Sequence, residues 1–216
     1  MNLRRRRSPT AIAAALLAVA SIGPIAASAH AQACDEVLLR GKWQHSPGQR
    51  LNLTVSYISE LPGRFGRGIY MEELAEALAH WNRGVYWHPE TAQNVAVPTL
   101  VTLRFVNGNN GHIRLFDKAW PDPNFIEGIA RTTWSPRKEG PIYGRVWIEL
   151  NQTHLRNTWN FWKRVKVITH ELGHALGLGH DYGHCDGKAT IMDQGDLWFD
   201  GPTPWDAQKL NFKYPF

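Results

Sequence analysis

The spacing of apolar residues along the chain predicts several strands. Residues 51–59 (LNLTVSYIS) alternate between apolar and polar side chains, which is the period of a strand with one buried face. Shorter runs rich in aliphatic, β-branched and aromatic residues predict three further strands, at residues 101–106, 129–134 and 145–150. Turn-forming residues dominate two other stretches, 107–111 and 136–141.

Three other segments are predicted to be helical. Residues 71–81 (MEELAEALAHW) repeat apolar side chains at helical spacing and predict an amphipathic helix. A second, longer helix is predicted over residues 159–178. Thr203 can cap a third, shorter helix, with Pro204 at its first position. Glycine and aspartate dominate residues 177–201, which are expected to be irregular loop, so the pattern as a whole indicates an α+β domain.

The N-terminal segment, residues 1–31, is predicted to be a signal peptide. Four arginines at 4–7 precede an apolar run at 11–22, and the small residue Ala31 fits a signal-peptidase site, with Ala29 and Ala33 as the alternatives. The apolar run is short and interrupted, so a retained membrane anchor is the weaker alternative. Residues 32–216 are then one secreted domain of ordinary size, because a domain usually has about 100–200 residues.

The net charge of +5 partly reflects the four arginines of the N-terminal segment. The rest of the chain is close to balanced, so we expect no nucleic-acid partner. No other apolar run is long enough to span a membrane, and we expect the mature protein to be a monomer that is free of the membrane. The 10 tryptophans are many for this length. We expect them to pack the core and line clefts, with a carbohydrate-binding face as the alternative.

The chain has two cysteines, Cys34 and Cys185. Passage through an oxidising compartment favours a disulfide bond between them. That bond would close a long loop and stabilise the fold by about 4–5 kcal/mol, if the effect is the lost entropy of the unfolded chain. A lipid anchor on Cys34 is the alternative, although Ala31 and Gln32 suit a lipidation motif poorly.

Most of the candidate chemistry lies in the sequence HELGHALGLGHD, which begins at His170. On a helix His170 and His174 lie one turn apart on the same face, so both imidazoles can reach one cation. Glu171 projects toward the same open side, where it could hold a water molecule and take its proton. Gly177 can adopt the left-handed conformation that ends a helix, which lets His180 return to the same metal. Three histidines leave one position of a zinc ion open, as a catalytic site requires.

A zinc ion held only for stability is the alternative to a catalytic site. Structural zinc sites are usually closed by four protein ligands, and Cys185 is the candidate for the fourth. Calcium is a second candidate cofactor, because Asp117, Asp122 and residues 107–110 could supply oxygen ligands, although their spacing fits no calcium-binding loop. The other histidines considered for a second zinc site are expected to lie at the surface: His88, His112, His154 and His184.

The motif HELGHALGLGH resembles the extended zinc motif of the metzincin metallopeptidases, HExxHxxGxxH. Met192, in the sequence IMD, resembles the methionine of the turn beneath the zinc ligands in that family. Trp43 followed by LNLTVSYIS, the sequence GRVWIELN, and the tail TPWDAQKLNFKY are similar to bacterial members of the matrixin branch. Asp181 after the third histidine departs from animal matrixins, Asp193 stands where the astacins have tyrosine, and Cys34 lacks the surroundings of a cysteine switch.

The resemblance covers most of the mature chain and implies a metzincin-type fold. A twisted, mostly parallel five-stranded sheet with two long helices would lie above the substrate cleft. A small irregular C-terminal subdomain ending in a helix would lie below it. Gly177, Met192 and Asp181 would support the zinc site. The same resemblance assigns substrate binding to a strand edge and to a loop residue, namely Ile129, Ala130, Arg131 and Thr132, and Trp198.

The sequence therefore predicts a secreted zinc endopeptidase that hydrolyses internal bonds of a polypeptide substrate. His170, His174 and His180 would bind the zinc ion, and Glu171 would act as general base and acid on a water molecule at the metal. The alternative is a secreted, non-catalytic module that binds cell wall or glycan and keeps the metallopeptidase fold. Glu171 separates the two hypotheses, because a pure binding protein has no need of a carboxylate beside the metal.

Overall fold

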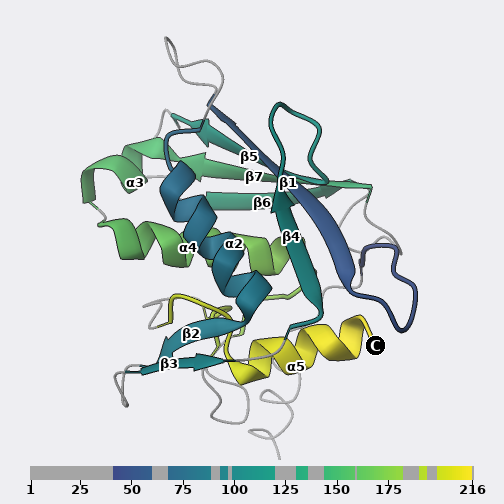
Figure 1. Cartoon of the computed structure of the whole chain (residues 1–216). Coiled ribbons are helices and arrows are strands. Elements are labelled where there is room, and N and C mark those ends of the chain that lie inside the picture. The colour runs from purple at the N-terminus through teal and green to yellow at the C-terminus, as the bar shows by residue number, and fades with distance from the viewer. Residues whose placement is uncertain are drawn as a thin grey trace, which may run out of the picture.

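The computed structural model describes residues 41–59, 68–88, 93–96, 99–119, 130–135, 144–158, 160–181, 190–193 and 199–215. Its centre is a five-stranded sheet in the order β4-β1-β5-β7-β6 (Figure 1). The strands are β1 (Leu51–Ser59), β4 (Val101–Phe105), β5 (Ile113–Lys118), β6 (Ala130–Ser135) and β7 (Arg145–Asn151). β4, β1, β5 and β7 run parallel, whereas β6 pairs antiparallel with β7. The fold is therefore α+β with a mostly parallel sheet, as predicted.

The helices of the described residues are α2 (Met71–Arg83), α3 (Gln152–Thr158), α4 (Phe161–Ala175) and α5 (Pro204–Lys213). Helices α2 and α4 cross in front of one face of the sheet, and α5 lies at the lower end of the domain in Figure 1. Trp81 of α2 is fully buried, and its indole N–H donates a hydrogen bond to the backbone carbonyl of Thr169 in α4 (3.0 Å). This contact fixes the helix that carries the histidines against its neighbour.

The prediction of one helix over residues 159–178 is wrong at both ends. Helix α4 begins after its cap, Asn160, whose side chain accepts a hydrogen bond from the backbone N–H of Lys163. It ends at Ala175, earlier than the apolar pattern suggests. The short helix α3 precedes it, and its sequence QTHLRNT has too few apolar residues to show a helical period.

The sequence pattern does not predict β5 or the small antiparallel hairpin formed by β2 (Val85–His88) and β3 (Gln93–Ala96). β5 lies in the middle of the sheet, yet its sequence IRLFDK contains three charged residues that obscure the alternation of a strand. One of them, Asp117, is fully buried. It accepts hydrogen bonds from the hydroxyl of Tyr57 and from the backbone N–H of Ile69 (2.8 Å), so these oxygens serve the fold.

The core fills the space between the sheet and the two long helices. In β1, Leu51, Leu53, Val55 and Tyr57 are buried on the face that packs against them, while the residues between these point to the opposite face. Tyr214, just after α5, joins the same core. Among the parts of the chain that the structure describes, no helix has the length and apolar character needed to cross a bilayer.

Candidate metal centre

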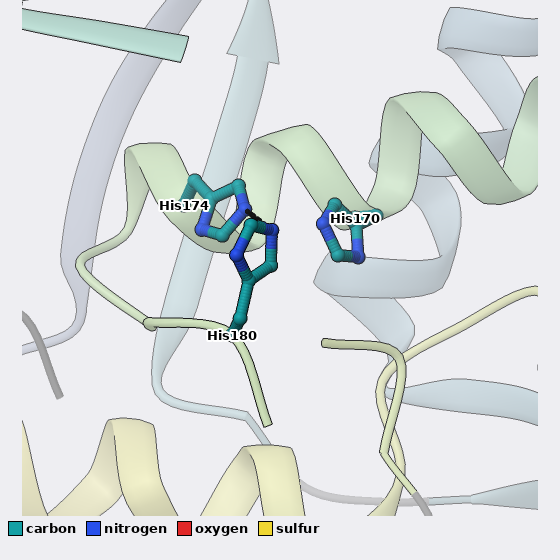
Figure 2. A group of neighbouring side chains, drawn as sticks. All are labelled: His170, His174 and His180. Carbon is teal, nitrogen blue, oxygen red and sulfur yellow. Dashed lines mark hydrogen bonds between the residues drawn. The ribbon is translucent and has the colours of Figure 1, made fainter. Parts of the chain in front are cut away.

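Three histidine side chains converge near the C-terminal end of helix α4 (Figure 2). His170 and His174 occupy the same face of the helix, and His180 approaches them from the segment that follows. One nitrogen atom from each ring lies within 4.8 Å of those from the other two rings, and the Nε2 atoms of His174 and His180 are 2.9 Å apart. Within the described residues, this is the one group of three or more His, Cys, Asp or Glu side chains placed to hold a metal ion.

Gly177 makes the turn that brings His180 back to the helix. Its φ of 95° lies in the left-handed region, which glycine adopts without steric cost. The backbone N–H of Gly177 donates to the carbonyl of His174 (2.9 Å), and that of Leu178 donates to the carbonyl of Gly173 (3.0 Å). These two bonds form a Schellman motif, which ends the helix and reverses the chain toward the other two histidines.

Backbone carbonyl groups fix the ring orientations of two of the histidines. Nδ1 of His170 lies 2.7 Å from the carbonyl oxygen of Ile191, and Nδ1 of His174 lies 2.8 Å from that of Leu178. Because a carbonyl oxygen only accepts, each Nδ1 carries the hydrogen and each Nε2 keeps its lone pair for a metal. Burial lowers the pKa of His170 to about 4, although the hydrogen bond to Ile191 raises it, so this ring is neutral at pH 7.

The side chain of Glu171 is buried in the same helix as two of the three histidines. The residue follows His170 directly in α4 and is only 7% exposed. Burial raises the pKa of Glu171 to about 7, while a hydrogen bond from the hydroxyl of Thr132 lowers it. A carboxyl group with a pKa near 7 can both take and release a proton at neutral pH, which is what general acid–base catalysis requires.

The turn that contains Met192 packs directly beneath helix α4. Met192 is fully buried, and a Cβ atom on Gly173 would run into its sulfur, so the helix needs a glycine at that point. The backbone N–H of Asp181 donates to the carbonyl of Met192 (3.0 Å), and Asp181 forms an isolated parallel bridge with Asp193. Asp181 is itself fully buried. It therefore joins the segment after the third histidine to the methionine turn.

Asp206, in the first turn of helix α5, holds that same turn in place. Its carboxylate accepts hydrogen bonds from the backbone N–H groups of Ile191 (3.0 Å) and Thr203 (2.8 Å), and from the hydroxyl of Thr190. Burial raises the pKa of Asp206 above its ordinary value, although these hydrogen bonds lower it in part. Because the carbonyl of Ile191 orients His170, Asp206 supports the metal site indirectly. The sequence places Asp206 only within a tail that resembles matrixins, and its link to His170 depends on the tertiary structure.

Side chains from both ends of the described chain satisfy the last carbonyl groups of helix α4. The indole N–H of Trp43 donates to the carbonyl of Ala175 (2.8 Å), and the hydroxyl of Tyr214 donates to that of Leu176 (2.9 Å). The backbone N–H of Trp43 in turn donates to the Tyr214 hydroxyl (3.2 Å). Carbonyls at a helix C-terminus have no partner within the helix, so these bonds hold the turn that carries His174.

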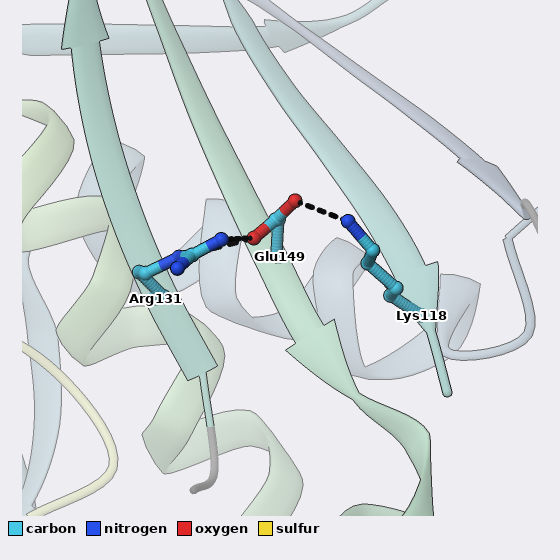
Figure 3. A network of polar contacts seen from close by, with 3 residues as sticks. All are labelled: Lys118, Arg131 and Glu149. Carbon is cyan, nitrogen blue, oxygen red and sulfur yellow. Dashed lines mark hydrogen bonds and ion pairs between the residues drawn. The ribbon is translucent and has the colours of Figure 1, made fainter. Parts of the chain in front are cut away.

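The residues of β6 that were expected to bind substrate point to both sides of the sheet. Ala130 and Thr132 lie on the core side, whereas Arg131 lies on the solvent side. There the guanidinium group of Arg131 forms an ion pair with Glu149, which also pairs with Lys118 at 3.0 Å (Figure 3). Burial raises the pKa of Glu149, but the hydrogen bonds from Lys118 and Arg131 and their positive charges outweigh it, so that pKa lies below its ordinary value.

Several predicted features lie outside the described residues and stay predictions. They are the signal peptide at 1–31, the disulfide of Cys34 and Cys185, the substrate contacts of Ile129 and Trp198, the calcium candidate Asp122, and His184. The described His112 lies at the surface, where its Nδ1 accepts a hydrogen bond from the backbone N–H of Thr54 (3.0 Å). It therefore belongs to the sheet surface and not to a second metal cluster.

The described residues thus contain a candidate centre for one metal ion, made of three imidazoles, and a buried carboxyl residue, Glu171, follows the first of them in the chain. No protein-family model matches the chain, and no curated protein matches its sequence. Among solved structures, 97 chains match. One of them is myroilysin, which is 13% identical, with 83% of this chain and 98% of that chain covered and a TM-score of 0.46. At that level of likeness, the function has to be inferred from the residues of the site.

Proposed function

We propose that the protein is a secreted, zinc-dependent endopeptidase of the metzincin type. The observation that carries the proposal is the convergence of three imidazoles on one point, with a buried carboxyl residue, Glu171, directly after the first of them in helix α4. Perturbed carboxyl groups of this kind are typical of functional sites. A metal that served only stability would have no use for such a group next to its ligands.

The donor set fits zinc. Neutral imidazole nitrogen is a preferred zinc ligand, and three protein ligands with one open position are typical of catalytic zinc sites. The carbonyl groups of Ile191 and Leu178 hold His170 and His174 in the tautomer that such a ligand needs. His180 is half-buried whereas His170 and His174 are buried, so we expect a substrate to approach the cluster from the side of His180.

A zinc ion held by these residues would supply Lewis acidity, which makes water nucleophilic near neutral pH and polarises the carbonyl group of a peptide bond. Glu171 takes one proton from the attacking water and passes it to the leaving nitrogen, so the C–N bond breaks after the C–O bond forms.

An internal segment of an extended polypeptide is the proposed substrate. β6 is an edge strand, with no neighbouring strand on its outer side among the described residues. An extended chain can add to such an edge through main-chain hydrogen bonds, whatever its sequence. β6 runs beside helix α4, where the indole N–H of Trp134 donates to the carbonyl of His174 (3.2 Å). A polypeptide added to this edge would therefore pass close to the metal ligands.

Export and a disulfide bond belong to the same proposal. Mass spectrometry of protein recovered from the culture medium should find an N-terminus at residue 32 and a link between Cys34 and Cys185. A diacylglyceryl mass on Cys34 would instead show a membrane-anchored lipoprotein.

The test of the function compares the parent with Glu171→Gln, and uses Glu149→Gln on the solvent face of the sheet as the matched control. We expect the parent and both variants to bind about one zinc ion per chain. The parent and the control should cleave casein, and a chelator should abolish cleavage until zinc is restored. Glu171→Gln should lower kcat by about 10²- to 10⁴-fold, because it removes the proton acceptor.

Two outcomes would contradict this assignment. If Glu171→Gln cleaved casein as fast as the parent, Glu171 would not be the general base. If the zinc-loaded parent cleaved no polypeptide in a peptide library, the non-catalytic binding module would become the better explanation of the same site.

A further inference from the structure

The core-facing side chains of β6 contact helix α4 at the functional site. The hydroxyl of Thr132 donates a hydrogen bond to Oε2 of Glu171 and lies 3.4 Å from the backbone carbonyl oxygen of the same residue. Two residues further along the strand, the indole N–H of Trp134 donates to the backbone carbonyl of His174. The Trp134 ring also packs edge-to-face against the imidazole of His174, with 6.4 Å between ring centroids. Strand β6 therefore touches both the acid–base group and a metal ligand.

The hydrogen bond between Thr132 and Glu171 is shielded from water, because both side chains are buried. Thr132 and Glu171 are 8% and 7% exposed, so neither polar group can exchange its partner freely for bulk water. Within the described part of the chain, Thr132 is the one side chain whose hydroxyl donates to the Glu171 carboxylate. Thr133, the next residue, is exposed on the opposite face of the strand and makes no such contact.

We propose that Thr132 is a positioning residue, which holds Oε2 of Glu171 so that Oε1 stays directed toward the water and the substrate. The inference rests on the proposed function and deepens it. A carboxylate on a long side chain turns about its last bonds, and each wrong orientation lowers the fraction of molecules ready for proton transfer. A hydrogen bond from a rigid strand restricts that rotation before substrate arrives.

The arrangement is compatible with both protonation states of Glu171. Before reaction both carboxylate oxygens accept hydrogen bonds, and Thr132 occupies Oε2 only. When Oε1 takes the proton from water, Oε2 is the carbonyl oxygen of a neutral acid and still accepts. The Thr132 hydroxyl therefore neither competes for the transferred proton nor has to move during the cycle.

A purely structural role for Thr132 makes a different prediction. A β-branched residue suits a strand, and valine has the same shape as threonine without the hydroxyl. If the side chain only fills space, Thr132→Val should leave catalysis unchanged. If the hydroxyl orients Glu171, Thr132→Val should damage catalysis, and Thr132→Ser, which keeps the hydroxyl, should restore most of it.

The experiment measures kcat and KM on a fluorogenic peptide for the zinc-loaded full-length parent and for Thr132→Val, Thr132→Ser and the matched control Thr102→Val, which lies in β4 at the opposite edge of the sheet. We expect Thr132→Val to lower kcat about tenfold, the typical effect of one hydrogen bond to a charged group, with KM changed by less than about twofold. Thr132→Ser should stay within about threefold of the parent, and Thr102→Val should match the parent. Zinc content and Tm should be the same in all four proteins.

The positioning role would be overturned by parent-like kcat in Thr132→Val. It would equally be overturned if Thr132→Ser lost as much kcat as Thr132→Val, because the hydroxyl would then be irrelevant. Loss of zinc or a lower Tm in proportion to the lost activity would assign Thr132 to the fold alone. Should Thr132→Val not fold, an about tenfold lower kcat in Thr132→Ser at parent-like zinc content and Tm would still overturn the role, because the hydroxyl is kept in that variant. An active parent that is inactivated by Glu171→Gln keeps the proposed function intact whichever of these results appears.

Discussion

Replacement of Gly177 by alanine is expected to weaken both the fold and the metal site. The φ of 95° at Gly177 is a conformation that costs an L-residue about 1–2 kcal/mol. A Cβ there would also run into Cε of Lys213 and lie 3.2 Å from the carbonyl oxygen of Gly41. Lys213 can move aside because the contact is near the end of a flexible side chain, so we add about 1 kcal/mol for its displacement.

Together these two effects lower the free energy of unfolding of Gly177→Ala by about 2–3 kcal/mol. For a domain of this size that lowers Tm by roughly 5–10 °C. Gly108→Ala is the matched control, because Gly108 has a φ of 81° and nothing within 4 Å of its Cβ position. In Gly108→Ala the free energy of unfolding should fall only by the cost of the positive φ, about 1–2 kcal/mol. Thermal unfolding of the chelator-treated proteins gives both values without a contribution from zinc.

Zinc affinity separates the two variants further. Because Gly177 makes the turn that returns His180 to the cluster, Gly177→Ala should weaken zinc binding by about 10- to 100-fold, while Gly108→Ala should leave it unchanged. Competition with a chromogenic chelator measures this directly. Equal losses of stability in the two variants, together with parent-like zinc affinity in Gly177→Ala, would refute the reasoning about this turn.

Two further predictions concern the core and the sheet surface. Gly173→Ala should destabilise the protein although alanine favours helix, because its Cβ runs into the sulfur of Met192; a higher Tm would contradict this packing. Glu149→Gln should lower the free energy of unfolding by about 0.5–1 kcal/mol at pH 7, since it removes the ion pairs to Lys118 and Arg131. The pKa of Glu149 is depressed in the fold, so its contribution is present above the ordinary value of 4.5 and is lost as pH falls through the folded value. Urea unfolding should show the difference between parent and variant shrinking below pH 4.5, and a constant difference would count against the pairing.

Local sequence patterns were enough to predict the elements that depend on residues close together in the chain. The alternation in residues 51–59 gives β1 with its observed bounds, because a strand with one buried face needs that period. Thr203 caps α5 through a capping box with Asp206, with Pro204 at the first position, because cap chemistry involves neighbours only. The types and spacing of the three histidines, with a glycine before the last, predicted the cluster for the same reason.

The tertiary structure decided what depends on residues far apart in the chain. β5 is a central strand because β1 and β7 pair with it on either side, not because its charged sequence favours a strand. The end of α4 is fixed by Trp43 and Tyr214, which lie in the first and last described segments. The spacing of apolar residues in the sequence does not predict such contacts, since they arise from packing of the helix against distant segments.

The same division applies to the site. The sequence by itself determined which side chains can bind a metal and which one can move a proton, because these are properties of residue type and of spacing along one helix and one turn. Only the fold placed Thr132 against Glu171, and Asp206 behind the carbonyl group that orients His170. Those contacts follow from the register of β6 on β7 and from the docking of α5, and neither is encoded in the residues next to the motif.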